Sequence, residues 1–179
     1  MAFVACFAGC SKIKQLANIN VNIPYSAQVT VPAVEGDTAG FPLPPGGVTL
    51  AFPSISVATN SQQYIAEYNT STDKILNVDL QNLALQILAP ANQNFNFLDS
   101  VEIYLSAPNQ PQVLVAYAYN VPKGLTTLNL TTETGVNLKS YFIQDTIVFT
   151  MSAHVNAIPA SGTQLNIAST FHLLANPLD

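Results

Sequence analysis

The chain has 179 residues and a formal net charge of −5, and only 8% of its residues are Asp, Glu, Lys or Arg, against about 25% in ordinary soluble proteins. It has no arginine and its five lysines are dispersed, so the clustered cations that bind phosphates are missing and we expect no nucleic-acid partner. Both cysteines lie in the first ten residues, which excludes a disulfide framework, a cysteine-based zinc site and a thiol nucleophile from the rest of the chain.

The length suits a single domain. Neutral Asn, Gln, Ser and Thr side chains supply most of the polar groups. Such a composition is typical of an extracytoplasmic or assembly-forming β protein, whose exposed positions carry amides and hydroxyls in place of charges.

The N-terminal segment is the part of the sequence that most directly predicts where in the cell the protein is located. Residues 1–9 are apolar or small and end in Ala8-Gly9, Cys10 follows, and Ser11-Lys12 is polar. This pattern resembles the lipobox of a bacterial lipoprotein signal. The resemblance implies a partial signal at residues 1–9, lipid attachment at Cys10, and a tether at residues 10–15 that precedes a domain of residues 16–179. A frayed hydrophobic N-terminus is the alternative interpretation, because the basic n-region of a secretory signal is missing.

The first half of the chain alternates apolar and polar residues, which predicts strands. The first predicted strand covers residues 16–23 and ends at Pro24, and the next begins at residues 27–31. Residues 32–47 collect proline and glycine, which cannot sustain a strand ladder, and are predicted as a crossover loop. Residues 48–57 form the following predicted strand.

One short helix is predicted near residues 61–69, with Asn60 or Ser61 as the residue that caps its first turn. Tyr64, Ile65 and Tyr68 lie on one side of this helix and are expected to pack onto a sheet. A second helical turn is predicted at residues 137–142.

From residue 75 onward nearly every segment is predicted as strand. Turn signals recur every 10 to 15 residues, which indicates an all-β fold, an antiparallel β-sandwich that is immunoglobulin-like or jelly-roll-like. Tyr117 and Tyr119 share the strand parity of Val113 and Val115 and are therefore predicted to face the core. The predicted strands are 76–80, 83–87, 101–106, 113–119, 125–130, 146–155 and 164–174.

The segment from about residue 80 to residue 178 contains FLDSVEIYL at 97–105, VLVAY at 113–117 and LKSY at 138–141. It resembles β-sandwich lipoproteins of unknown function from Bacteroidota. The resemblance implies a sandwich held to the outer membrane and carries no catalytic signature. In surface-exported lipoproteins of that phylum an acidic cluster follows the cysteine, whereas residues 11–14 here are basic, which favours a periplasm-facing anchor.

The candidate catalytic and metal-binding residues do not combine into a known site. His154 and His172 approach one another if strands 146–155 and 164–174 pair as a hairpin, but zinc needs a third ligand, and no His, Asp or Glu lies within five residues of either. Asp99 and Glu102 are spaced to lie on opposite faces of a strand, which argues against a glycosidase pair. We therefore predict no cofactor, no metal and no enzymatic activity.

The predicted function is that of a non-enzymatic, membrane-anchored extracytoplasmic lipoprotein that presents an amide-rich surface to an envelope protein or a glycan. Two alternatives remain open. One is a structural subunit of a filament or shell, because scarce charge weakens the usual guard against edge-to-edge strand pairing. The other is a carbohydrate-binding domain, which would use exposed aromatic side chains among Tyr64, Tyr68, Tyr104, Tyr117 and Tyr119.

Overall fold

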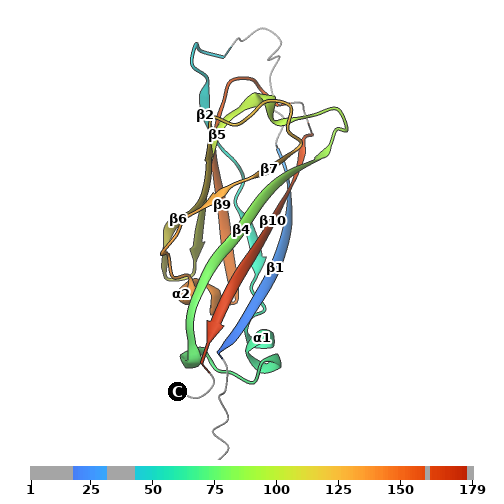
Figure 1. The fold of residues 1–179 in the computed structure, drawn as a ribbon. Coiled ribbons are helices and arrows are strands. Elements are labelled where there is room, and N and C mark those ends of the chain that lie inside the picture. Colours follow the sequence, from blue (N-terminus) through green and yellow to red (C-terminus); the bar gives the residue numbers. More distant parts are fainter. Residues whose placement is uncertain (1–17, 32–42, 160–161, 177–179) are drawn as a thin grey trace, which may run out of the picture.

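The strands form two antiparallel sheets that pack face to face (Figure 1). A computed structural model describes residues 18–31, 43–159 and 162–176. Cys10, the predicted signal and tether, and most of the predicted crossover loop lie outside these residues. The strands are β1 (Ile19–Thr30), β2 (Val48–Ala51), β3 (Ile55–Ala58), β4 (Ile75–Ala89), β5 (Leu98–Ala107), β6 (Gln110–Tyr119), β7 (Thr127–Asn129), β8 (Thr131–Thr132), β9 (Thr146–Val155) and β10 (Gln164–Ala175).

The order of the strands is that of a jelly roll. Sheet A has the order β1-β10-β4-β7 and sheet B the order β2-β9-β5-β6-β8, with β3 also paired to β9. If β2 with β3, and β7 with β8, are each counted as one interrupted strand, eight strands remain, and the first is the neighbour of the last. In an immunoglobulin sandwich the first strand would pair with the second. The all-β antiparallel sandwich predicted from the sequence is thus confirmed, and the jelly-roll arrangement decides between its two types.

The core lies between the inner faces of the two sheets. Every second residue of β9 is buried, from Ile147 to Val155, and β10 shows the same alternation, as expected for strands with one face on a core. Burying such side chains contributes about 1.5–3 kcal/mol each. The largest fully buried side chains are Phe95, Phe142, Phe171, Ile23, Ile75, Leu83, Leu85, Ile103, Leu105, Leu138, Ile147 and Leu165.

Strand β1 continues through Pro24, so the predicted end of the first strand at this residue is wrong. Pro24 lies opposite Thr170 of β10 in an unbroken register from Ile19 to Thr30. Because β1 is the edge strand of sheet A, half of its backbone N–H groups point away from the sheet. A proline at such a position removes no ladder hydrogen bond.

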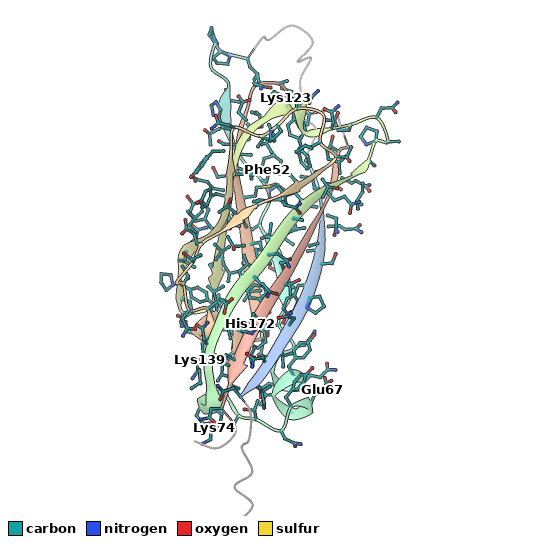
Figure 2. The ribbon with its side chains drawn as sticks, in the orientation of Figure 1. Phe52, Glu67, Lys74, Lys123, Lys139 and His172 are labelled. Atoms are coloured by element: carbon teal, nitrogen blue, oxygen red, sulfur yellow. The ribbon has the colours of Figure 1, made fainter. Side chains whose placement is uncertain are left out.

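The predicted strand 48–57 is interrupted between β2 and β3. Pro53 cannot donate to the ladder, and Phe52 turns inward, where its side chain is buried (Figure 2). The Phe52 amide still donates to the Met151 carbonyl of β9 at 3.0 Å. Both short strands therefore pair with the same partner, β9, on either side of the break.

The two helices occur where the sequence predicts them, as α1 (Ser61–Glu67) and α2 (Lys139–Phe142). Ile65 of α1 is buried and lines an apolar groove together with Val21, Ile23 and Leu173 of sheet A. The predicted packing onto a sheet is confirmed for Ile65 and for the partly buried Tyr64, whereas Tyr68 is exposed. Asn60 is the N-cap residue of α1, but its side chain makes no capping hydrogen bond and its backbone is left-handed, with φ 51°. The Ser61 amide at the start of the helix instead donates to Thr59 Oγ1 at 3.3 Å. Among the described residues no helix is long and apolar enough to cross a membrane.

The two C-terminal strands do not form a hairpin. Strand β9 lies between β2 and β5 in sheet B, whereas β10 lies between β1 and β4 in sheet A. Each strand has one buried face, apolar in β9 and apolar except for Ser169 in β10, and the two faces contribute to the core of the sandwich. Adjacent strands with such faces can pack face to face or pair edge to edge.

Candidate functional site

The outer face of sheet B carries a group of tyrosines that the sequence assigns to the core. Strands β5 and β6 pair with a shift of register, since Ile103 lies opposite Ala116 but Tyr104 lies opposite Leu114. Val115 is the extra residue of this bulge, and beyond it every side chain of β6 changes face. Tyr119 is consequently 53% exposed, and the prediction that Tyr117 and Tyr119 face the core is wrong.

Glu102 of β5 is the centre of what we call the tyrosine cluster, which consists of Glu102, Tyr104, Tyr117 and Tyr119. The Tyr104 hydroxyl donates to Glu102 Oε2 at 2.7 Å, and the Tyr119 hydroxyl donates to Glu102 Oε1 at 2.8 Å. Tyr117 lies directly opposite Glu102 in the register. Its ring packs beside that of Tyr119, with 5.0 Å between centroids and 32° between planes.

These hydrogen bonds set the charges of the cluster. The bond from Tyr104, and then the bond from Tyr119, lowers the pKa of the Glu102 carboxyl. The same bonds to Glu102 raise the pKa of both phenols. At neutral pH Glu102 is therefore a carboxylate, and the phenols of Tyr104 and Tyr119 are neutral. Because each phenol proton is directed at the carboxylate, the lone pairs of the phenol oxygens remain available to accept hydrogen bonds.

The cluster is continued by hydroxyl side chains in cross-strand rows. Tyr119, Ser100 and His154 form one row, Tyr117, Glu102 and Ser152 the next, and Tyr104 and Thr150 a third. Thr131 of β8 extends the middle row beyond Tyr117. The outer face of sheet B thus passes from aromatic rings on β5 and β6 to the hydroxyls of Ser152 and Thr150 on β9, with His154 at the end of the first row.

The outer face of sheet A is rich in amides, and we call it the amide face. Within its described rows Asp79 is the one carboxylate, and its Oδ1 lies 3.3 Å from His172 Nδ1. A hydrogen bond of 2.7 Å joins Ser26 Oγ to Asn166 Oδ1 across two strands. The rows are Asn20–Leu174–Asn77, Asn22–His172–Asp79, Pro24–Thr170–Asn82, Ser26–Ala168–Ala84–Asn129 and Gln28–Asn166–Gln86–Thr127.

Two lysines lie toward opposite ends of the sandwich. Figure 2 places Lys123 toward one end and Lys74 toward the other. Lys123 pairs with Asp99 at 3.3 Å, and Asn156 Nδ2 also donates to Asp99 at 2.6 Å. Asp99 and Glu102 hold separate partners, so the structure gives no paired-carboxylate site at these two residues.

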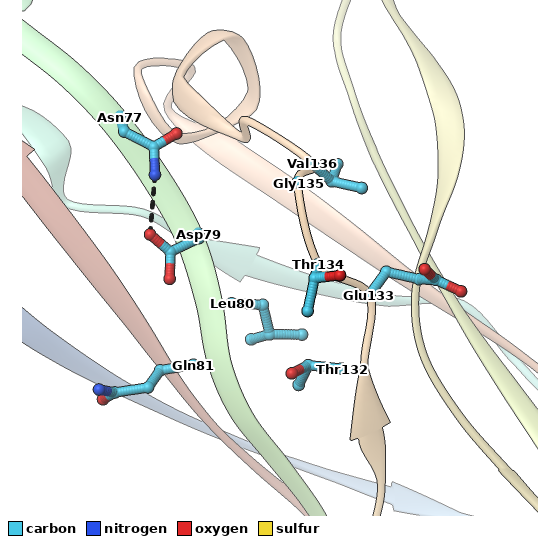
Figure 3. Close-up of a pocket in the computed structure, with 9 residues that line it drawn as sticks. All are labelled: Asn77, Asp79, Leu80, Gln81, Thr132, Glu133, Thr134, Gly135 and Val136. Atoms are coloured by element: carbon cyan, nitrogen blue, oxygen red, sulfur yellow. Dashed lines mark hydrogen bonds between the residues drawn. The ribbon is translucent and has the colours of Figure 1, made fainter.

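A polar cavity of about 400 Å³ lies beside β4, where Asn77 and Asp79 face the segment that follows β8 (Figure 3). Asn77 Nδ2 donates to Asp79 Oδ1 at 2.8 Å. Asp79 Oδ1 therefore already accepts from an amide and lies next to His172. The carboxylate of Glu133, the other acidic residue of the lining, points away from Asp79 (Figure 3). Its lining is Asn77, Asp79, Leu80, Gln81, Thr132, Glu133, Thr134, Gly135 and Val136.

The histidines lie in different sheets, so they do not approach one another across a hairpin. His154 Nε2 lies 2.6 Å from the Gly46 carbonyl and its Nδ1 lies 3.4 Å from Thr49 Oγ1. Within residues 18–31, 43–159 and 162–176 no three His, Cys, Asp or Glu side chains are grouped as metal ligands. Cys10, the predicted lipid site, lies outside these ranges.

Sequence reasoning missed the role of Glu102. The signal was present, because Glu102 and Tyr104 are two residues apart on one strand and must share a face. Tyr119 shares this face only because of the bulge at Val115. The alternation of apolar and polar residues in the sequence does not reveal that bulge.

Comparison with known proteins gives remote likenesses only. No protein-family model matches the chain, and no curated protein does. A chain from the structure of Turnip yellow mosaic virus is 13% identical with a TM-score of 0.30, over 91% of this chain and 96% of that one. A Desmodium yellow mottle tymovirus chain is 12% identical with a TM-score of 0.26, over 92% and 93%. A chain of infectious bursal disease virus, Gx strain, is 14% identical with a TM-score of 0.22, over 89% and 42%.

Proposed function

We propose that the chain is a non-enzymatic binding module, held by lipid on Cys10 at the periplasm-facing side of a bacterial outer membrane, that takes an envelope protein or glycan on its outer sheet faces. The observation that carries this proposal is the scarcity of charge on both faces, since the described rows hold one carboxylate each, Asp79 on sheet A and Glu102 on sheet B. Five cross-strand rows of sheet A hold mostly amides, hydroxyls and small side chains around a single carboxylate–histidine pair. Neutral donors and acceptors in regular rows suit a partner recognised by hydrogen bonds.

The anchor rests on the sequence. An apolar run, Ala8-Gly9 and Cys10 resemble a lipobox, and Lys12 and Lys14 follow directly. Lysines so close to an acylated cysteine would contact anionic headgroups, at about 1 kcal/mol each. The lipid would supply roughly 0.8 kcal/mol per buried methylene group.

The anchor is tested by the intact mass of the protein extracted from its own membrane fraction, beside a Cys10→Ala variant. The expected result is a mature N-terminus at Cys10 with added acyl mass, which is lost in the variant. An unprocessed chain of about 19.1 kDa in the soluble fraction would contradict the anchor.

Binding is tested separately with the Cys10→Ala chain, which removes the lipid and leaves the faces. We expect it to cosediment with isolated outer-membrane fragments at 0.1 M and at 0.5 M NaCl, because contacts between neutral groups are not screened by salt. Ala168→Lys places a cation in the Ser26–Ala168–Ala84–Asn129 row of the amide face and is expected to reduce the bound fraction. The matched control Ala66→Lys, at an exposed position of α1, is expected to leave it unchanged.

Self-assembly into a filament or shell is a second candidate, favoured by one observation. Strand β1 is a 12-residue edge strand that contains no charged residue, and charge is a usual guard against edge pairing. Pro24 in its middle acts in the opposite direction. Sedimentation velocity over a concentration series distinguishes the two functions, because a tethered monomer keeps one sedimentation coefficient.

A further inference from the structure

We propose that the tyrosine cluster on the outer face of sheet B is a carbohydrate subsite that receives one pyranose ring of a neutral β-linked oligosaccharide. The inference rests on the proposed function, since it names the ligand class and the residues for one of the two outer faces. It is carried by the arrangement of three phenols around Glu102.

The rings of Tyr117 and Tyr119 supply the apolar contact. They lie 5.0 Å apart, are tilted by 32°, and Tyr119 is 53% exposed, which is unusual for a large aromatic side chain on a strand. In a β-linked, gluco-configured pyranose all ring substituents are equatorial, so each face of the sugar is a patch of axial C–H groups. Such a patch packs on the negatively polarised face of an aromatic ring.

The polar groups of the cluster match the hydroxyl rim of that sugar. Each Glu102 oxygen accepts one phenol proton, and a carboxylate has about four lone-pair sites in all, so both oxygens can accept a sugar O–H as well. The Tyr104 and Tyr119 oxygens, whose protons point to Glu102, can accept others. The hydroxyls of Ser100, Ser152 and Thr150 continue this set along the neighbouring rows.

The charge of the surroundings favours a neutral sugar over the two charged classes of ligand. An anionic glycan would meet the Glu102 carboxylate. A cationic peptide would meet only this one charge, because Asp99, the nearest acidic residue along β5, is already paired with Lys123 and Asn156. Two phenols also stabilise the Glu102 charge, so it needs no cation.

The test is calorimetric titration of the full chain with cellohexaose and with chitohexaose. We expect Tyr119→Ala and Tyr117→Ala to weaken binding at least about tenfold, the effect of losing roughly one aromatic contact. Tyr119→Phe keeps the ring but not the bond to Glu102, and is expected to weaken binding less than Tyr119→Ala. The matched control is Tyr68→Ala, which removes another exposed tyrosine, on α1, and is expected to leave binding unchanged.

Three results would overturn the subsite. The first is that neither oligosaccharide binds at millimolar concentration. The second is equal weakening by Tyr68→Ala and Tyr119→Ala. The third is binding of a tetralysine peptide, abolished by 0.5 M NaCl, in place of the sugars. Circular dichroism of each variant shows whether it folds, and Tyr119→Phe provides a readout if an alanine variant does not. None of these results bears on the lipid mass at Cys10 or on cosedimentation through the amide face.

Discussion

The hydroxyl of Tyr25 in sheet A hydrogen-bonds to Thr59, which follows β3 of sheet B. Removing this hydroxyl tests how much the bond between the two sheets contributes to stability. The Tyr25 hydroxyl donates to the Thr59 carbonyl, while the Thr59 hydroxyl donates to the Gln144 carbonyl and the Thr59 amide donates to the Asp145 carbonyl at 3.0 Å. Thr59 is 0% exposed. Tyr25→Phe would remove the hydrogen bond to the Thr59 carbonyl and leave that carbonyl buried without its donor.

The expected loss is about 1–3 kcal/mol of unfolding free energy, the cost of a buried polar group that loses its partner. Tyr25→Phe should leave packing unchanged, because the ring keeps its edge contact with Phe171 at 5.6 Å and 83°. At about 2–4 °C per kcal/mol for a chain of this size, the thermal midpoint should fall by roughly 2–12 °C. Urea unfolding followed by far-ultraviolet circular dichroism measures the difference, with Tyr68→Phe on exposed α1 as the matched control.

A pH series gives a second readout of the same hydroxyl. Burial, and to a smaller extent Tyr64, raises the pKa of Tyr25 above its ordinary value of 10.0. The unfolded chain therefore releases this proton near pH 10 while the folded chain retains it, so the stabilisation is complete below pH 10 and is lost as the pH rises further. The gap between the wild type and Tyr25→Phe should narrow above pH 10. A Tyr25→Phe midpoint equal to that of the wild type at pH 7 would refute the reasoning.

Three further predictions concern stability. Phe171→Ala, at a side chain 1% exposed, should cost about 3–5 kcal/mol of unfolding free energy in urea, and a loss below about 1 kcal/mol would contradict its place in the core. Gly47→Ala should lower the thermal midpoint more than Gly46→Ala. Both residues have positive φ, but of the two only Gly47 would bring an added Cβ against a backbone oxygen, that of Val155, at 2.3 Å. Equal midpoints of the two variants would contradict this. Glu102→Gln should flatten the acid limb of the stability curve. The pKa of Glu102 is lowered from 4.5, so its stabilisation is present above that pH and is lost as the pH falls through the folded-state value; identical acid limbs would exclude the role given to the cluster.

The sandwich could be predicted from the sequence because its signals are local. Alternation from Thr146 to Val155 and from Gln164 to Ala175 marks strands with one buried face, and the structure contains both. The pairing of these strands could not be predicted in the same way. Whether two neighbouring strands pair edge to edge or pack face to face depends on what else covers them, and here β1, β4, β2 and β5 do so.

The candidate site could not be predicted from the sequence because of a single residue, Val115. Counting by twos from Val113 assigns Tyr117 and Tyr119 to the core, and the count is correct until Val115. One extra residue there moves both tyrosines to the opposite face. Pro24 led to the opposite error, because the sequence predicts a strand end where the strand continues. A proline ends a strand only where its missing N–H would pair with a neighbouring strand, and the sequence alone does not show that β1 lies at the edge of sheet A.

The position of β10 has a consequence for how the protein folds. It is the last of the described strands, yet it lies between β1 and β4 and pairs along its whole length with β1, from Ile19 with Ala175 to Thr30 with Gln164. Contacts between segments so far apart in the sequence form slowly, so β1 and β4 have no common partner until β10 joins them. The completion of sheet A therefore depends on its most distant pairing, and we expect this sheet to form later than the β5–β6 hairpin of sheet B.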